Sequence, residues 1–490
     1  METVSQQRHF NVGEYSLVAT LFLRCLALIY LSAFLSIGVQ IEGLAGPQGI
    51  LPFTDVIEHY TTEAGISKYW KLPTLFWLDA SNAALIGVAY AGCIFSLFLF
   101  FNLLPRTSLF ILLILYLSLY HAGQLFMNFQ WDYLLMESGF LALFLTSRSR
   151  IVIWMFRWLL FRFRFLSGAS KLISGDPSWA SLTAVIYYFE VQPLPNWLSW
   201  YAHHLPDWLL TFGAGLTLFV ELVIPFMMFL PRRYRFVAAW ITIVLQVIIM
   251  ITSNHNWFNL LTIALCLFLF DDKAIQRALP SRFIDWLIRK PLPVPSPGKI
   301  YRYSFSTVSA VLVFVSIILA GEMFVGEKAT GLTKEIVNVV RPFHIVNNYH
   351  VFPTMKTERI ELVISGSIDG NDWQTYTFKY KPGDANVYPE IVIPHQPRLD
   401  WLAWFVTIHP MFVPWYEKFL YALMDNRPDV VGLLENNPFP DKPPNYLNID
   451  AFRYTFTDWK TKQETGNWWN VEYLGPFPPL PGIYREQSQP

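Results

Sequence analysis

Three basic side chains recur every seven residues in an apolar stretch of the sequence: Arg157, Arg164 and Lys171. Seven helical steps of 100° return to within about 20° of the same direction, so these side chains form one stripe, with Arg162 off it. A charge at bilayer depth costs about 2.5–3.5 kcal/mol and requires a partner or a wet cavity. The stripe either faces inward toward acidic partners, or Arg157 and Lys171 snorkel to opposite surfaces and leave Arg164 alone in need of a partner.

Acidic side chains in neighbouring apolar stretches are candidate partners for this stripe. Asp132 and Glu137 lie in the preceding stretch, and Glu221 lies in the following one. Opposite charges offset the cost of their burial only when they are in contact. For the inward-facing case we predict an intramembrane charge network of these three acids with Arg157 and Arg164.

The end of the stripe suggests a second type of chemistry. Lys171 precedes a long aromatic loop that contains Glu190, His203 and His204. A lysine in an apolar setting has a lowered pKa and can act as a base, so Lys171, His204 and Glu190 are candidate catalytic residues. The alternative is an interfacial aromatic belt with solvated histidines. No metal site is predicted, because adjacent helical residues point about 100° apart.

A third candidate lies in the last third of the chain, where the sequence PHQPRLDW is dense in functional side chains. His395, Arg398 and Asp400 can form a polar cluster, with Trp401 and Trp404 as apolar anchors for a client protein or a domain interface. The alternative is a structural corner, in which Asp400 pairs with Arg398 or another base and the tryptophans enter the core. The sequence lacks G-x-S-x-G, H-E-x-x-H, P-loop and G-x-G-x-x-G motifs, so common hydrolase, zincin and nucleotide sites are unsupported.

The composition places most of these residues in a membrane. The 490 residues are 53% hydrophobic and only 15% charged, whereas soluble proteins carry roughly 25% charged residues. Lys+Arg and Asp+Glu are equal at 36 each, which excludes a nucleic-acid binder driven by overall basic charge. The cysteines, Cys25, Cys93 and Cys266, all lie in apolar runs and support no disulfide framework or zinc site.

Apolar runs of about 20 residues, the length that crosses ~30 Å of hydrocarbon, fill the first two thirds of the chain. We predict a polytopic α-helical bundle of about nine spans in residues 1–325, with long outer loops at 39–79 and 172–207 and short fourth and eighth spans. The expected spans are Ser16–Gly38, Ala80–Leu104, Ser108–Met127, Asp132–Ser147, Ile151–Lys171, Trp208–Leu230, Tyr234–Ser253, Trp257–Phe270 and Ser304–Val325.

The orientation follows from the loops between these spans. Alternate loops are basic, around Arg106, Arg148, Arg232 and 271–302, and the intervening loops are acidic or neutral. Basic loops stay in the cytoplasm, so we predict a cytoplasmic N-terminus and an extracytoplasmic C-terminal domain. The sequence contains no N-x-[ST] site, which favours a bacterial inner membrane over a glycosylating compartment such as the endoplasmic reticulum.

Residues 326–490 read as a soluble α+β domain with a β-sandwich-like sheet. Arg359–Ser367 and Trp373–Lys381 alternate in polarity around a turn at Gly370, which predicts a β-hairpin. Phe452, Tyr454 and Phe456 mark a third strand. Short helices are expected at Arg398–Phe405, Trp415–Asp425 and Val430–Glu435.

Several long stretches of the sequence resemble the lipase maturation factor family, and the resemblance covers nearly the whole chain. These stretches are QWD with ESGFLA from Gln130 to Ala142, FRFRFLSGASKL from Phe161 to Leu172, DPSW from Asp176, QPLP from Gln192, HHLP from His203, PHQPRLDW from Pro394, NPF from Asn437 and WW at Trp468. The resemblance implies a multi-pass membrane protein, located in the endoplasmic reticulum in animals, that helps secreted lipases reach their folded, active state. With no N-x-[ST] site and no cysteine in its C-terminal third, the chain looks like a bacterial member.

A more distant similarity connects the bundle to the membrane domain of vitamin-K-dependent γ-carboxylases. Gly168, Lys171, Asp176 and Trp179 follow the order of a segment whose lysine acts on the vitamin hydroquinone in those enzymes. Those enzymes have two adjacent lysines, and here Ser170 stands in place of one of them. The gap before Trp179 is also longer. The resemblance therefore implies only that Lys171 is a candidate base.

Two functional hypotheses follow. The first is a membrane-bound maturation factor without catalytic activity or cofactor, whose partners are membrane lipid and a secreted, lipase-like client, with no nucleic acid. The second is an intramembrane enzyme that acts on a quinone or a lipid with Lys171 as base. A transporter is less well supported, because paired broken helices are not evident in the two halves.

Overall fold

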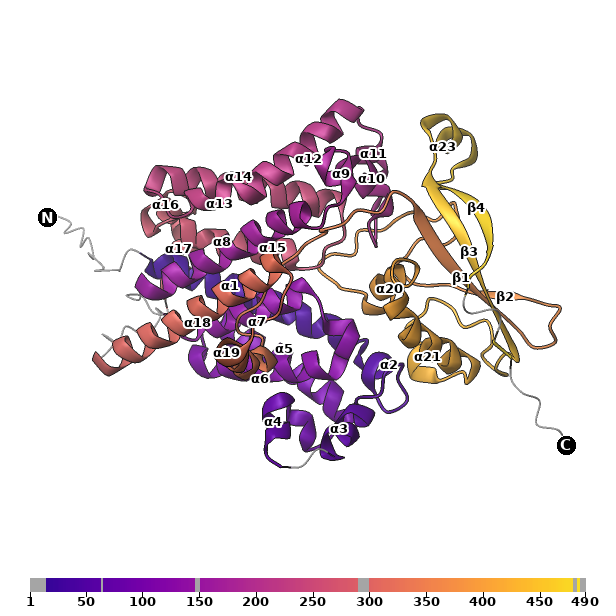
Figure 1. Cartoon of the computed structure of the whole chain (residues 1–490), viewed down its shortest axis with the longest axis horizontal. Helices are drawn as coiled ribbons and strands as arrows, with labels where there is room; N and C mark the ends of the chain where they lie inside the picture. The colour runs from indigo at the N-terminus through magenta and orange to yellow at the C-terminus, as the bar shows by residue number, and fades with distance from the viewer. Residues whose placement is uncertain (1–14, 63–64, 146–149, 290–298, 479–482, 485–490) are drawn as a thin grey trace, which may run out of the picture.

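The computed structural model describes residues 15–62, 65–145, 150–289, 299–478 and 483–484. A helical bundle forms one side of the molecule and a small sheet forms the other, with helices α20 (Arg398–Ala403) and α21 (Val413–Met424) between them (Figure 1). The fourth predicted span ends at residues 146–147, and two of the basic loops contain Arg148 and 290–298; these positions lie outside the described residues.

Among the described residues, five helices are long and apolar enough to cross a membrane, or six when one bent pair counts as a single span. The bent pair is α11 (Trp197–His203) with α12 (Asp207–Leu222), which meet at 109°. The expectation of nine spans is therefore not supported. The five are α1 (Ser16–Gly38), α5 (Asn82–Phe100), α6 (Pro105–Gly123) with η2 (Gln124–Met127), α14 (Arg232–Thr252) and most of α18 (Lys299–Val325).

Three of the other predicted spans do not qualify as membrane-crossing helices, either because the helix is too short or because it carries too many charges. Helix α7 (Gln130–Ala142) has 13 residues, about 20 Å at 1.5 Å per residue, and is too short to cross alone. Helix α15 (Phe258–Cys266) is shorter still. Helix α8 (Arg150–Ile173) has 24 residues, enough for the distance, but carries five basic side chains. Helix α8 instead runs through the middle of the bundle with most of its residues buried.

Shorter helices complete the chain between and after these elements. They are α2 (Ile41–Ala45), α3 (Phe53–Thr62), α4 (Ser67–Lys71), η1 (Leu75–Trp77), α9 (Pro177–Ala180), α10 (Ala184–Val191), α13 (Ile224–Met227), η3 (Leu267–Leu269), α16 (Asp272–Ala278), α17 (Ser281–Ile288), α19 (Gly331–Val340), η4 (Arg341–Phe343), η5 (Trp404–Thr407), η6 (Pro410–Phe412), α22 (Pro428–Val431) and α23 (Trp459–Thr465).

The sheet is antiparallel throughout, in the order β2-β1-β3-β4, with β5 pairing with β3. The predicted hairpin is formed by β1 and β2, and Gly370 adopts a positive φ of 85° in the turn, a conformation that costs glycine little. The strands are β1 (Arg359–Ser367), β2 (Gln374–Tyr376), β3 (Tyr446–Phe456), β4 (Trp469–Pro476) and β5 (Ile483–Tyr484).

A second sheet is not present among the described residues, so the β-sandwich expectation is wrong in this respect. Helices α20 and α21 cover the sheet instead, close to where short helices were predicted (Figure 1). The bundle and this α+β layer share one hydrophobic core that includes both Phe22 of α1 and Phe419 of α21. The two parts therefore pack directly against each other.

Candidate functional site

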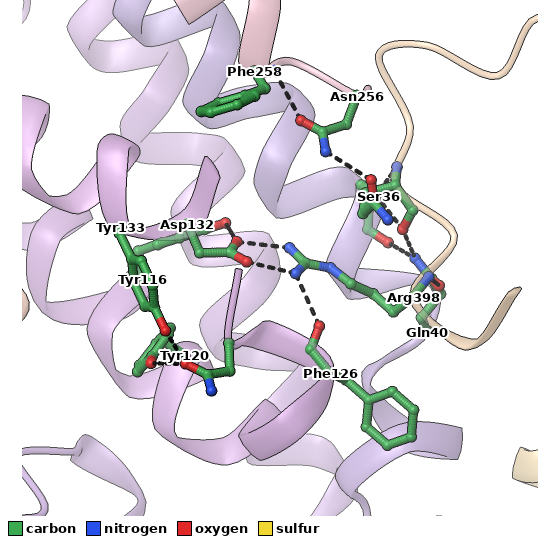
Figure 2. A network of polar contacts seen from close by, with 12 residues as sticks. Ser36, Gln40, Tyr116, Tyr120, Phe126, Asp132, Tyr133, Asn256, Phe258 and Arg398 are labelled. Carbon is green, nitrogen blue, oxygen red and sulfur yellow. Dashed lines mark hydrogen bonds and ion pairs between the residues drawn. The ribbon is translucent and has the colours of Figure 1, made fainter. Parts of the chain in front are cut away.

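The centre of the contact between the two parts is a buried ion pair. Arg398, the first residue of α20, reaches into the bundle and contacts Asp132 of α7 through two hydrogen bonds of 2.7 and 2.8 Å (Figure 2). Both side chains are fully buried. Tyr116 donates to the same carboxylate at 2.6 Å, and Arg398 also donates to the carbonyl of Phe126 at 3.0 Å. This bidentate geometry is the strongest form of an arginine–carboxylate contact.

The residues before Arg398 are bound by the bundle through polar side chains. Gln40, beside the end of α1, accepts a hydrogen bond from the backbone N–H of Arg398 at 2.7 Å (Figure 2). Ser36 accepts from the backbone N–H of Gln396 at 2.9 Å, and Asn256 donates to the Gln396 side chain at 2.7 Å. The bundle therefore binds Arg398 and the residues before it through both their backbone N–H groups and the Gln396 side chain.

A second contact brings the segment before the sheet into the bundle. Glu137 of α7 forms a buried ion pair with Arg162 of α8, the basic residue that lies off the predicted stripe. Tyr349 donates to the Glu137 carboxylate at 2.8 Å, and Asn347 donates to it at 3.3 Å. Arg162 in turn donates to the carbonyl of Asn347 at 2.8 Å. Residues beyond the predicted boundary at 325 therefore supply partners for charges inside the bundle.

The third contact contains two residues of the predicted stripe. Lys171 donates to Glu221 of α12 at 2.8 Å and to the carbonyls of Val351 at 2.7 Å and Ser167 at 3.3 Å. Arg164 lies 3.3 Å from the other oxygen of Glu221. The ammonium of Lys171 has three donors and all three are used. Each donor of the Lys171 ammonium therefore has an acceptor within the protein.

The other predicted network residues are divided among these contacts. Asp132 pairs with Arg398 rather than with α8, and Glu137 pairs with Arg162. Arg157 donates to the carbonyl of Phe268 at 3.0 Å and to the hydroxyl of Tyr15 at 2.8 Å. The basic residues of the stripe therefore have different partners along α8. Arg157 contacts Phe268 and Tyr15, whereas Arg164 and Lys171 both contact Glu221.

The three candidate catalytic residues are not joined to one another. Within the described ranges, no hydrogen bond or ion pair connects Lys171 with His204 or Glu190. His204 contacts the carbonyl of Trp200 at 2.7 Å. Glu190 accepts from the backbone N–H of Phe456 in β3 at 2.7 Å, so it attaches the sheet to the bundle. Burial raises the pKa of this carboxyl.

The candidates around Arg398 all lie at or near this contact between the domains. His395 is half-buried, with Nδ1 2.9 Å from the hydroxyl of Ser36. Asp400 is buried and accepts from the backbone N–H groups of Tyr380 and Lys381 at 2.8 and 3.0 Å. Burial raises the pKa of Asp400 to about 6, against these hydrogen bonds. Asp400 therefore supports the loop after β2 and does not pair with Arg398.

Residues 347–356, which reach from the C-terminal part into the bundle, are called the inserted segment. An aromatic pocket of about 350 Å³ lies where the bundle, the inserted segment and α20 meet. Trp401 is buried in its wall, and Trp404 is half-buried there. Polar groups on the wall include His255, His350 and Lys356. Apolar lining residues come from all three parts and include Phe129, Trp131, Phe352, Phe405, Met411 and Phe412.

The buried charges of this region are paired with one another. The buried acids Asp132, Glu137 and Glu221 each contact a buried base, so none is a free general acid or base. In the part of the chain that the structure describes, no group of three His, Cys, Asp or Glu residues could hold a metal ion. The aromatic pocket is open to a ligand.

Several of these partners were not anticipated from the sequence. Tyr349, Asn347 and Val351 belong to a segment without regular structure that was assigned to the soluble domain. Gln246 of α14 and Asn259 of α15 are buried polar residues within apolar helices. Polar residues in such helices are costly and generally have a role, so a search for uncharged polar side chains would have found these two.

Comparison with known proteins gives one family over almost the whole chain. Residues 17–277 match the family model described as "Lipase maturation factor transmembrane domain", and residues 345–479 match "Lipase maturation factor C-terminal domain". The chain is 32% identical to lipase maturation factor 2 of Xenopus laevis, over 96% of this chain and 83% of the relative. It is also 32% identical to lipase maturation factor 1 of Mus musculus, over 96% of this chain and 88% of the relative. No solved structure matches.

Proposed function

Since the chain belongs to the lipase maturation factor family, we propose that it is a membrane-bound maturation factor that assists the folding or assembly of a secreted lipase. The enzyme alternative is not favoured. Lys171, which that alternative needs as a base, donates all its protons to fixed acceptors.

The observation that carries this proposal is the aromatic pocket between the domains. Its walls combine large apolar side chains with few polar groups, as do sites that bind apolar segments of proteins. Met411 is 61% exposed and marks its rim. A client that has not completed its own core exposes apolar side chains, and this pocket would shield them at the membrane surface.

The buried ion pairs give this pocket a fixed shape. Arg398 lies three residues before the pocket residue Trp401, and Val351 and Phe352 in another wall follow the Glu137 partner Tyr349 closely. A pocket whose walls are held before binding loses less conformational entropy when a client enters. The charge network therefore acts on the client through the geometry of the pocket.

The test is a lipase maturation assay in a host that lacks family members. A secreted lipase of the source organism is expressed with the wild-type chain or with the double variant Trp404→Ala, Met411→Ala, and lipase activity per mass of secreted enzyme is measured. Loss of pocket contacts should lower this specific activity at least about fivefold, since interface anchors of this kind dominate binding energy.

The matched control is Tyr421→Ala, which removes a 56% exposed aromatic side chain of α21 outside the pocket. It should leave lipase maturation unchanged. Normal maturation by the double variant would refute the role of the pocket. Normal lipase activity in cells without the chain would refute the maturation function itself.

We further propose that the bundle lies in a bacterial inner membrane with a cytoplasmic N-terminus and residues 326–490 outside the cytoplasm, in contact with membrane lipid and the secreted client. Counted as five spans, the apolar helices place the N-terminus and residues 326–490 on opposite sides of the membrane. Basic Arg106, at the connection between the second and third of these helices, favours a cytoplasmic N-terminus. The absence of N-x-[ST] sites favours the bacterial membrane. Protease added to spheroplasts should cut within the exposed loop around Val387. If the loop were cut in inverted vesicles, whose outer face is the cytoplasmic face, and not in spheroplasts, this orientation would be refuted.

A further inference from the structure

A second, smaller cavity of about 90 Å³ lies beside the aromatic pocket and is lined mainly by residues of the bundle. Helices α8, α12, α14 and α15 and the inserted segment all contribute to its walls. His255, Phe258, Val351 and Phe352 line both cavities, so the two spaces are neighbours separated by these side chains. The smaller cavity has no part in the proposed docking of a client.

Uncompensated hydrogen-bond donors surround this cavity. Arg164, Gln246 and Asn259 line it, and each is at most 3% exposed. Nε of Arg164, Nε2 of Gln246 and Nδ2 of Asn259 have no hydrogen-bond partner within the protein. Buried donors are nearly always paired in native proteins. Three donors without acceptors around one cavity are complementary to an acceptor-rich group.

The charged residues at the cavity have a net positive charge. Two cations, Arg164 and Lys171, share the single carboxylate of Glu221, which leaves one positive charge in excess. No acidic residue lines the cavity among the described side chains. A buried charge without a counter-charge is strongly unfavourable, so a group with one negative charge complements the site.

The remaining walls are apolar. Phe163, Val185, Ile249 and Met355 face the cavity beside the polar groups. Helix α14, which carries Gln246 and Ile249, presents exposed apolar side chains such as Val244, Ile248 and Ile251 on its outer surface. Since α14 is long and apolar enough to cross a membrane, this outer surface is suited to contact with lipid.

From this combination we propose that the cavity binds the oxyanionic group of a lipid that carries one negative charge, while the hydrocarbon chain extends out of the cavity. Arg164, Gln246 and Asn259 donate to the oxygens of the head. Two sources share this chemistry, the carboxylate of a free fatty acid and the phosphodiester of an anionic phospholipid.

Binding is measured on the purified full-length protein in a neutral detergent, by displacement of a fluorescent fatty acid and by the midpoint of thermal unfolding. The probes are oleate, oleyl alcohol and dioleoylphosphatidylglycerol. Oleate or the phospholipid should raise the midpoint, and the alcohol, which has the same chain without charge, should bind at least about tenfold more weakly than oleate. The probe that binds more tightly identifies the source.

Gln246→Met removes one donor with little change of volume and should weaken binding of the anionic lipid about tenfold. The control is Thr242→Val on the same helix, because Thr242 is also buried without a hydrogen-bond partner but does not line the cavity. It should leave binding unchanged. Equal affinity for oleate and oleyl alcohol, or undiminished binding by Gln246→Met, would overturn the proposal. Neither measurement uses a client protein, so failure of the lipid-binding proposal can be distinguished from failure of the proposed maturation function.

Discussion

Replacing Arg398 by methionine tests whether the ion pair with Asp132 holds the two domains together. The substitution keeps an unbranched apolar stem but removes both hydrogen bonds to the carboxylate, and both side chains are fully buried in the wild type. Asp132 then remains buried with Tyr116 as its donor. Loss of one partner of a buried pair costs about 3–5 kcal/mol, and we expect the free energy of unfolding to fall by this amount.

The double variant Arg398→Met, Asp132→Asn separates the charge from the packing. With both charges removed, no uncompensated carboxylate is buried, so most of the lost stability should return. A coupling free energy of about 2–4 kcal/mol between the two sites is expected. Unfolding is measured by denaturant titration in mixed micelles, followed by tryptophan fluorescence.

The control for this cycle is Arg453→Met, which breaks a solvent-exposed pair with Glu472. Exposed ion pairs are screened by water and contribute little, so this variant should unfold like the wild type. A loss of less than about 1 kcal/mol for Arg398→Met would refute the reasoning, because it would be the magnitude of a surface pair. Additive effects of the two single substitutions would show that the side chains act independently.

Three further perturbations address the other contacts. Gly168→Ala places a Cβ 2.7 Å from the Cβ of Glu221, and overpacking between α8 and α12 should lower the free energy of unfolding by about 1–3 kcal/mol. Tyr349→Phe removes the 2.8 Å hydrogen bond to Glu137 and should cost about 1.5–3 kcal/mol. Burial raises the folded-state pKa of Asp400 to about 6, so its contribution to stability is full below about pH 4 and is lost as the pH rises through 6. Asp400→Asn should therefore be more stable than the wild type at pH 8, by at most ~3 kcal/mol, with no such gain at pH 4. Each difference is read from the same denaturant titration.

Contrary results have equally specific meanings. Wild-type stability of Gly168→Ala would show that the two helices can separate without cost. An unchanged Tyr349→Phe would mean that Arg162 alone balances Glu137. A pH-independent difference between Asp400→Asn and the wild type would exclude a raised pKa of this carboxyl in the folded state.

The local elements near the C-terminus were accessible from the sequence because they depend on short-range patterns. Alternating polarity and Gly370 predicted the β1–β2 hairpin, and the short helices near Arg398 and Trp415 lie close to where they were expected. The count of spans was not accessible in the same way. Helix α7 is apolar enough to read as a span, but its 13 residues are too few to cross the membrane alone.

Composition and apolar runs were enough to predict a helical membrane protein with a β-rich C-terminal domain, and to predict that the charges of Arg164, Lys171 and Glu221 require partners. The identity of each partner became clear from the folded chain. Asp132 selects Arg398, which lies 266 positions away, and Glu137 selects Arg162 and Tyr349. Periodicity places a charge on one face of its own helix, whereas its partner depends on how distant segments pack together, and no local pattern records that packing.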